Sequence, residues 1–350
     1  MSTQPNIPLY GRKWNLTITP SDGSDPIFIT SDTEPNSLRI TFDIEYVAYQ
    51  AIQTAMISVY NLNAVSTQVA LRQGSQIVLN GGYQVGSNYG TLFDGFVIRS
   101  TFEKENVTDY KLTMQCVNGL DLLINNMVNF ATGPFQSQQK IIEQIAANAM
   151  KTFQVAGLDP ALGTTSLPKP KVLFGQPKKY MEQIARDNNM TWMIGSNGVF
   201  VGNFDFGPNT VADVVYSPAI PPGSTQTPDP GVSYSILGTP QQTPQGLALR
   251  VLLDARMVIK LPPVAVKVDN SFIKFLPITP GEYPPVLTPD GLYAVGAVRH
   301  YGDSYLSNNW LTEIQAFVTS AQKLAILGIA TGSGAQAGQT QNIRTATQVG

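Results

Sequence analysis

Strict alternation of apolar and polar side chains in residues 38–46 constrains the fold of this chain more than any other feature of its sequence. Five apolar residues alternate with four polar ones, in the order Leu38, Arg39, Ile40, Thr41, Phe42, Asp43, Ile44, Glu45 and Tyr46. Successive side chains of a β-strand point to opposite faces of its sheet, so this period predicts a strand with one buried face and one solvated face. A sheet that is covered on one face only is therefore expected.

Similar runs predict further strands along most of the chain. They cover residues 14–18, 55–59, 76–83, 91–101, 109–117, 190–194, 199–204, 247–253, 257–261, 264–268 and both sides of a turn within 291–317. Glycine-rich turns separate many of these runs, which is typical of a meander or a closed barrel. A short segment at 64–71 has a composition that is compatible with a helix.

Two longer helices are predicted in the middle of the chain. In residues 137–153 apolar side chains recur at the helical spacing, and Ser137 is placed to cap the first turn. The second helix begins at Pro177, a residue suited to a first helical turn, and extends to Asn188. The strands at 190–194 and 199–204 follow, joined by a tight turn at Gly195–Gly198.

The composition excludes several classes of function. Only 13% of the 350 residues are charged, against about a quarter in a typical soluble domain. The net charge of −2 provides no basic field for general nucleic-acid binding. The single cysteine, Cys116, and the single histidine, His300, cannot build a disulfide framework or a zinc site, so neither a metal nor a cofactor is expected. Cys116 lies in an alternating run and is predicted to be a small buried hydrophobe.

Signals for secretion or membrane insertion are not evident. The first 14 residues lack the apolar core of a signal peptide, and no apolar run approaches the ~18 residues needed to cross a bilayer. We therefore expect no membrane-spanning segment, and synthesis and assembly in the cytosol.

One local cluster of basic residues consists of Lys169, Lys171, Lys178 and Lys179. A phosphate or nucleic-acid site would need more positive charge and aromatic platforms beside it. A solvated loop or an interface with an acidic partner is favoured instead.

The segment from Gly291 to Phe317 holds the candidate site residues. His300 and Asp303 lie at the mouth of its predicted turn, and Trp310 begins its second strand. His300 could be a general base oriented by Asp303, or both side chains could hold the corner of the hairpin through local hydrogen bonds. A catalytic triad also needs a nucleophile in its own sequence context, and none is evident nearby. We therefore predict no catalytic residue, and a structural role for His300, Asp303 and Trp310.

The same hairpin resembles a known protein family. Its residues Gly291, Tyr293, Val295, Val298, His300, Gly302, Asp303, Trp310, Thr312 and Ile314 resemble the C-terminal part of phage tail baseplate hub proteins. This contractile-tail hub family is related to late control protein D and to the hub part of VgrG spikes. The segments Ile57–Leu62, Gly81–Tyr83 and Phe93–Gly95 are similar to its first domain, although the family more often has Ala at the position of Gly81. The helix and hairpin that contain Pro177 and Trp192 are similar to its small mixed domain.

The resemblance covers nearly all of residues 10–325 and implies a fold class and a domain division. The fold would be mainly β (α+β), with two tube-like antiparallel β-barrel domains and an intervening small helix-plus-hairpin domain. The first barrel would occupy residues 1–127, the small domain 128–208, and the second barrel, with a Pro-rich loop, 209–328. Residues 329–350 lack periodic apolar side chains and would form a flexible C-terminal tail.

The resemblance also implies a structural function without enzymatic activity. Such a hub is a homotrimeric ring in the virion, at the tail baseplate, that adapts the sixfold tail tube to the threefold central spike. Synthesis and assembly would take place in the host cytoplasm. The expected partners are the tail tube protein, the central spike protein, other baseplate proteins and the tape-measure protein, with DNA only in transit through the channel.

Two other functions remain open at this stage. One is a tail-associated peptidoglycan hydrolase whose acids are not recognisable from their spacing. The other is a carbohydrate-binding tail protein that stacks sugars on Trp14, Trp192 or Trp310. Each tryptophan lies in an apolar, strand-like run, so a place in the core is favoured for all three.

Overall fold

A computed structural model gives the fold of the chain. It describes residues 10–31, 37–48, 53–85, 88–119, 126–149, 155–164, 166–195, 198–204, 210–220, 229, 231–243, 246–274, 291–306 and 309–318. The C-terminal tail expected at 329–350 and most of the Pro-rich loop lie outside the described residues.

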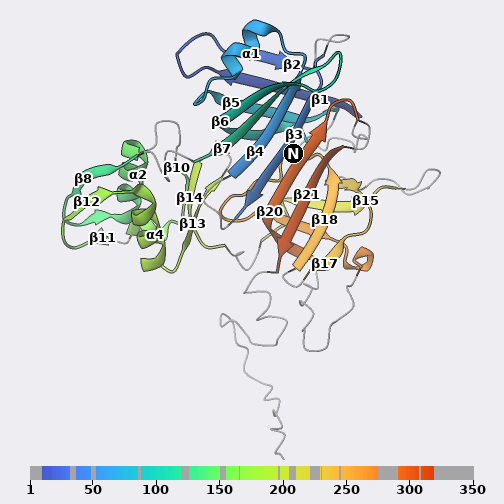
Figure 1. The fold of residues 1–350 in the computed structure, drawn as a ribbon. Helices are drawn as coiled ribbons and strands as arrows, with labels where there is room; N and C mark the ends of the chain where they lie inside the picture. Colours follow the sequence, from blue (N-terminus) through green and yellow to red (C-terminus); the bar gives the residue numbers. More distant parts are fainter. Residues whose placement is uncertain are drawn as a thin grey trace, which may run out of the picture.

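One large mixed sheet of 14 strands forms the body of the protein (Figure 1). Its strands are β1 (Tyr10–Thr19), β2 (Ile27–Thr30), β3 (Ile40–Val47), β4 (Gln53–Tyr60), β5 (Gln76–Val85), β6 (Gly90–Lys104), β7 (Tyr110–Asn118), β15 (Val214–Pro218), β16 (Val232–Ile236), β17 (Gln241–Thr243), β18 (Gly246–Leu252), β19 (Ala265–Val268), β20 (Leu292–Asp303) and β21 (Trp310–Phe317). The order along the sheet is β17-β18-β16-β15-β19-β20-β3-β4-β7-β6-β5-β1-β2, and β21 pairs with β18 and β20. The prediction of a mainly β protein is confirmed.

The alternation in β3 determines which face of the sheet is covered. Ile40, Phe42, Ile44 and Tyr46 are buried, whereas the side chains between them are half-buried or exposed. The sheet is therefore covered on one face along this strand, as predicted. The helix α1 (Ala64–Ala70) also lies where it was expected, and Asn63 caps it by accepting a hydrogen bond from the backbone N–H of Ser66 at 2.8 Å.

The prediction of a strand at residues 257–261 is wrong. Met257, Ile259 and Leu261 are buried, but the segment pairs with no strand among the described residues. Pro262 and Pro263 follow directly, and because proline has no backbone N–H, a central strand ladder cannot continue through them. The segment therefore fills the core as an extended loop.

Strand β20 connects the two ends of the sequence. Its first residues pair with β19, and from Ala297 onward the same edge pairs with β3, while β21 follows its other edge. The change of partner falls at Gly296, where an added Cβ would lie 1.8 Å from the ring of Phe317. Gly296 therefore allows the strand to change partners over a closely packed aromatic ring. We call the β3–β20 pairing the seam.

Each side of the seam has its own pattern of pairing. On the C-terminal side the ladders form a circuit, because β20 pairs with β21, β21 with β18, β18 with β16, β16 with β15, β15 with β19, and β19 with β20. On the N-terminal side the order β3-β4-β7-β6-β5-β1-β2 is a row of antiparallel strands. One hydrophobic core extends from Trp14 to Val318 and therefore includes residues from both sides.

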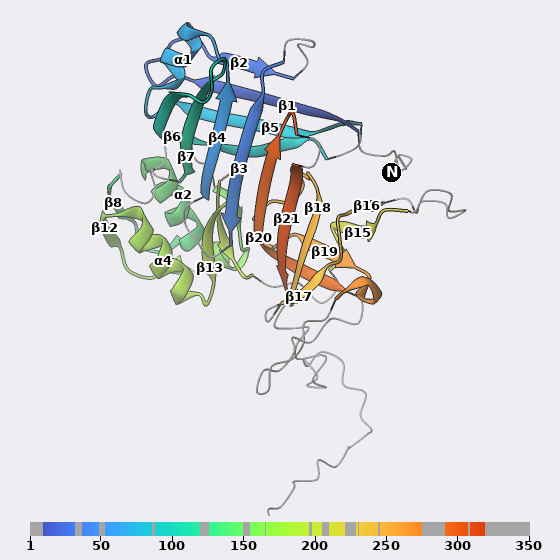
Figure 2. The same cartoon turned by 45° about the vertical axis from the view of Figure 1, so that its right-hand side comes forward.

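A smaller unit lies beside the body (Figures 1 and 2). It contains β8 (Val128–Thr132), β9 (Gln136–Ser137), α2 (Gln138–Ala149), β10 (Val155–Leu158), α3 (Ala161–Thr164), β11 (Ser166–Leu167), β12 (Lys171–Gly175), α4 (Pro177–Asp187), β13 (Thr191–Gly195) and β14 (Gly198–Gly202). A separate hydrophobic cluster, drawn from residues 128–201, holds it together. Hydrogen bonds attach it to the body, since the side chains of Gln53 and Asn118 donate to the carbonyls of Ile194 and Gly195 at 2.6 and 3.4 Å.

Local features of the small unit agree with the sequence. The hydroxyl of Ser137 accepts a hydrogen bond from the backbone N–H of Lys140 at 3.3 Å, as expected for a cap of α2. Pro177 occupies the first turn of α4. The hairpin of β13 and β14 is present, but β8 and β12, which pair with each other, were not predicted.

Candidate functional site

Trp310, the first residue of β21, joins the hairpin to the N-terminal side of the body. Its ring is 1% exposed and meets the ring of Phe42 edge to face, at 5.0 Å between centroids. Its indole N–H donates to the carbonyl of Gly82 at 3.0 Å. Gly302 lies beneath the two rings, and a Cβ there would approach Phe42 to 2.5 Å and Trp310 to 2.7 Å. Packing at this point therefore depends on a glycine between two aromatic side chains.

His300 is buried in the core on the same side of β20. Its Nδ1 lies 2.9 Å from the hydroxyl of Thr312, and its Nε2 lies 3.2 Å from the carbonyl of Met257. The backbone N–H of Asp254 already donates to the Thr312 hydroxyl at 3.0 Å, so the hydroxyl proton is free to point at Nδ1 and the ring proton then resides on Nε2. Burial lowers the pKa of His300 to about 4. A neutral ring with both nitrogens engaged in the core has no nitrogen left for proton exchange with a substrate.

Asp303 binds different partners from those of His300. Its carboxylate accepts two hydrogen bonds from Arg39, at 3.2 and 2.7 Å, and one from the backbone N–H of Tyr305 at 2.9 Å. Burial acts to raise the pKa of Asp303, but the hydrogen bonds from Arg39 and the backbone outweigh it and hold the pKa below its usual value. The carboxylate thus orders the turn of the hairpin and links it to β3.

A second buried acid, Asp254, lies close to His300. Tyr216 donates to it at 2.6 Å, and Arg256 binds both of its oxygens at 2.9 and 2.6 Å. Burial raises the pKa of Tyr216 well above its ordinary value. Because these hydrogen bonds satisfy the carboxylate completely, the group is suited to fixing the loop at 254–257 in the core.

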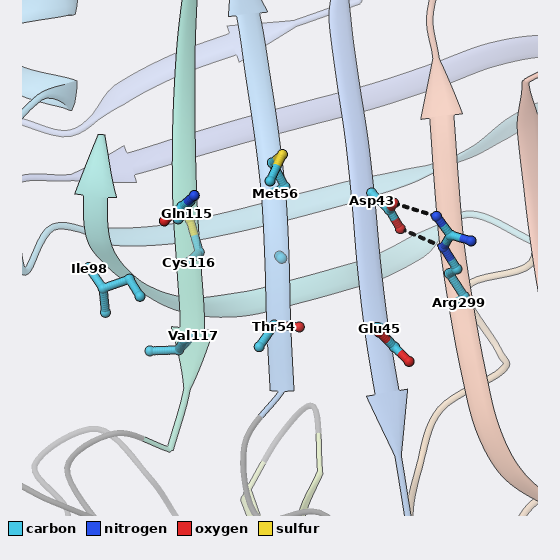
Figure 3. A pocket seen from close by; sticks show the side chains of 10 residues that line it. Asp43, Glu45, Thr54, Met56, Ile98, Gln115, Cys116, Val117 and Arg299 are labelled. Atoms are coloured by element: carbon cyan, nitrogen blue, oxygen red, sulfur yellow. Dashed lines mark hydrogen bonds and ion pairs between the residues drawn. The ribbon is translucent and has the colours of Figure 1, made fainter. Parts of the chain in front are cut away.

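The outer face of the seam carries a ladder of charges from four strands. Arg299 on β20 binds Asp43 on β3 through two hydrogen bonds of 2.8 and 2.6 Å, which Figure 3 shows. The Nη1 of Arg299 lies 3.8 Å from the carboxylate of Glu313 on β21. Glu313 in turn binds Arg250 on β18 at 2.6 Å. We call Asp43, Arg299, Glu313 and Arg250 the charge ladder. Since charges of opposite sign alternate along it, the ladder carries no net charge.

A shallow hollow of about 410 Å³ lies beside the charge ladder on the same face. Thr54 and Met56 of β4 and Gln115 of β7 point into it, with Ile98 at its far side (Figure 3). Cys116 also borders the hollow, but burial raises the pKa of its thiol to about 12, so the thiolate nucleophile is not available at neutral pH. Among the residues that the structure describes, no cluster of His, Cys, Asp or Glu is arranged to hold a metal ion. These features suit a contact surface better than a reaction centre.

Two of the three tryptophans lie in the core, as the sequence indicated. Trp14 and Trp310 are each 1% exposed, and Trp192 is half-buried against the core of the small unit. A sugar-stacking platform on Trp14 or Trp310 would require the core to open. Within the described part of the chain, no helix is long and apolar enough to span a membrane.

Sequence reasoning singled out His300, Asp303 and Trp310 but missed the charge ladder and the Asp254 cluster. The structure does not bring His300 and Asp303 together as partners, since their hydrogen bonds go to Thr312 and Arg39 respectively. Arg299 and Glu313 could have been found from their alternation with buried neighbours in β20 and β21. Asp43 could be assigned to them only once β3 was known to pair with β20.

Comparison with known proteins supports the fold but assigns no family. No protein-family model and no curated protein matches the sequence. The structure is similar to a tail protein from Neisseria meningitidis, with a TM-score of 0.52 and 10% identity over 88% of this chain and 97% of that one. A prophage tail protein from Shewanella oneidensis gives a TM-score of 0.49 and 8% identity over 87% and 98% of the two chains. A type VI secretion component from E. coli gives a TM-score of 0.45 and 9% identity, over 83% of this chain and 76% of that one. The similarity to the Neisseria protein confirms, at the level of the fold, the resemblance to tail proteins that the sequence suggested.

Proposed function

We propose that this protein is the structural baseplate hub of a phage tail, a homotrimeric ring that adapts the sixfold tail tube to the threefold central spike. The observation that carries the proposal is the seam, because it joins two β units of one chain edge to edge in a single sheet. The similarity of fold to the Neisseria tail protein over nearly the full length of both chains supports it.

The proposed domain division follows the seam and the small unit. The C-terminal circuit of ladders favours a barrel in residues 209–328, and the row of strands before the small unit favours a second, more open barrel in residues 1–127. The separate hydrophobic cluster favours a small domain at 128–208. Residues 329–350 would be a tail outside these domains.

Symmetry gives the proposed mechanism. Three chains with two β units each would present six units around a channel, which matches the number of subunits in a hexameric ring of tail tube protein. The same ring retains threefold symmetry for the central spike. Other baseplate proteins would bind its periphery, and the tape-measure protein and DNA would pass through the channel. Such a part in the virion acts by shape and needs no cofactor.

A non-enzymatic role is consistent with the chemistry of the site. His300 is enclosed, Asp303 and Asp254 are bound by arginines, and Asp43 and Glu313 of the outer face are paired in the charge ladder. Incubation of the purified protein with cell-wall sacculi should therefore release no soluble fragments. Turnover in that assay would instead favour a peptidoglycan hydrolase.

Imaging of the assembled tail tests the proposed location. A small peptide tag inserted at the turn around Gly133, where a Cβ would meet no atom within 4 Å, should appear as three symmetric densities around the tail axis at the end of the tube. Tag density along the tube, on fibres, or absent from the particle would contradict a hub.

A further inference from the structure

Two parts of this chain have opposite net charge. The small unit, residues 128–204, contains seven Lys and Arg against four Asp and Glu, whereas the rest of the chain contains 15 against 20. The small unit is therefore basic, and the remainder is acidic. Among the exposed apolar side chains of each part is a group that lies on regular structure.

The basic part exposes one face of the β8–β12 sheet. In the antiparallel register, Val172 lies opposite Ala131 and Phe174 opposite Asn129, so these side chains share a face, with Met127 one step further along. Met127, Val172 and Phe174 are 61%, 71% and 66% exposed. We call Met127, Ala131, Val172 and Phe174 the Phe174 face. Figures 1 and 2 show β8 and β12 at the end of the small unit that is remote from the large sheet.

Lysines flank this face at both ends of β12. Lys169 precedes the strand and is exposed, while Lys178 and Lys179 follow it in the first turn of α4. That turn holds no acidic residue, although the partial positive charge of a helix N-terminus favours acids there. Lysines thus outnumber acids beside the apolar surface, although Glu182 lies 3.7 Å from Lys178.

Phe174 is also held rigidly. The hydroxyl of Tyr180 accepts a hydrogen bond from its backbone N–H and donates one to its carbonyl, both at 2.8 Å. An exposed aromatic residue on a fixed backbone loses little conformational entropy when it is covered by a partner.

The acidic part presents the turn between β6 and β7. Val107 at its end is 88% exposed, and Phe102 and Tyr110 stack on each other at 5.5 Å while remaining 45% and 44% exposed. Glu103 and Glu105 are exposed beside them. We call Phe102–Tyr110 the Val107 tip.

The Val107 tip is as well fixed as the Phe174 face. The side-chain oxygen of Asn106 accepts hydrogen bonds from the backbone N–H groups of Thr108 and Asp109 at 2.9 and 2.8 Å. Asp109 is in turn bound by Asn61 and Asn106 at 2.9 and 2.7 Å. The fold thus holds the turn in a fixed conformation, although the side chain of Val107 is exposed and does not pack in the core.

The two surfaces cannot meet within one chain. Strand β7 runs from the Val107 tip to Asn118, which touches the small unit at Gly195. Nine residues of β-strand span about 30 Å, so the tip points away from the small unit of its own chain.

We propose that the Val107 tip of one copy of this chain docks on the Phe174 face of the next copy. Apolar side chains would meet in the centre, with the glutamates of the tip against the lysines of the face at the rim. A contact between two different surfaces is head-to-tail and can close into a ring, so this inference rests on the proposed homotrimer and specifies its interface.

Charge exchange in the full chain tests the contact. Reversal of the face (Lys169→Glu, Lys178→Glu and Lys179→Glu) should weaken self-association at least about tenfold, as should reversal of the tip (Glu103→Lys and Glu105→Lys). The variant that carries both reversals should recover the association, as measured by sedimentation equilibrium. Lys140→Glu, an exposed residue of the small unit outside the face, should have no effect.

Disulfide trapping gives an independent readout, because the chain's single cysteine, Cys116, is buried. The double variant Val107→Cys and Phe174→Cys should give covalent dimers and trimers on oxidation, and each single variant should not. Far-UV circular dichroism and melting curves confirm that every variant is folded.

The outcomes separate this inference from the proposed function. A wild-type trimer that withstands both reversals, or that is not rescued by the exchange, overturns the contact but leaves the hub intact. Loss of the reversed variants from tails, with an unchanged trimer, would assign the face to another protein and also overturns the contact. A wild-type monomer at all concentrations overturns both.

Discussion

The two faces of the β20–β21 hairpin use neighbouring residues in opposite ways. On the inner face, His300 and Trp310 are each 1% exposed, and every polar atom of their side chains has a partner in the core. On the outer face, the side chains of Arg299 and Glu313 are 50% and 31% exposed and pair with other charges in contact with water. Because a buried polar group is costly unless it is bonded, while an exposed ion pair contributes little, stability should reside on the inner face. The outer face is free to make contacts with other molecules.

The largest effect is expected for Trp310→Ala. Removal of a buried indole that packs on Phe42 should lower the free energy of unfolding by about 3–5 kcal/mol. Trp310→Phe keeps most of the packing but loses the hydrogen bond to Gly82, so its cost should be smaller. Urea denaturation measures both, and a cost for Trp310→Ala below about 1 kcal/mol would mean that the inner face does not hold the two sides together.

Acid should act through His300. Its pKa is lowered to about 4 in the folded chain, whereas an unperturbed histidine titrates near 6.5, so the unfolded chain binds more protons between these values. The free energy of unfolding should therefore fall as the pH drops from about 6.5 to about 4, by about 3 kcal/mol in total.

His300→Gln removes the titrating group, so it should flatten that pH profile while lowering stability at pH 7 by on the order of 1 kcal/mol. Thermal melts at a series of pH values give both quantities. A slope that persists unchanged in His300→Gln would assign the acid sensitivity to another group.

Gly302→Ala should have an intermediate effect. The new methyl group would press on the rings of Phe42 and Trp310, and overpacking of this kind costs about 1–3 kcal/mol. Gly133→Ala, where nothing lies within 4 Å, is the matched control and should change stability by less than about 0.5 kcal/mol. Equal melting temperatures for the two variants would show that the core beneath β20 is loosely packed.

The smallest effect is expected for Arg299→Ala on the outer face. Its ion pair with Asp43 is exposed to water, and pairs of this kind contribute at most about 1 kcal/mol. High salt screens exposed charges, so it should further reduce the difference in the free energy of unfolding between Arg299→Ala and the wild type. A loss comparable to that of Trp310→Ala would abolish the distinction between the two faces.

The same distinction explains how much could be predicted from the sequence. Alternation located β3, which has one buried face, and partial alternation located β20 and β21, whose first residues are buried on both faces. Helical spacing with Ser137 and Pro177 located α2 and α4. Alternation gave a wrong strand at residues 257–261, where apolar side chains enter the core from a loop that ends in two prolines.

What the sequence could not indicate was pairing between distant segments. The seam joins residues about 250 positions apart, and no local pattern specifies that Asp43 will lie beside Arg299. Likewise, nothing near His300 indicated that Thr312 and Met257 would bind its ring. The residues were identified, but their partners depend on how the whole sheet assembles.

The mass of the purified chain in solution tests the central claim most directly. A hub of this kind should sediment at equilibrium as a species of about three times 37.9 kDa at micromolar concentration. A monomer of 37.9 kDa that persists at every concentration reached, or a dimer with twofold symmetry, would contradict it.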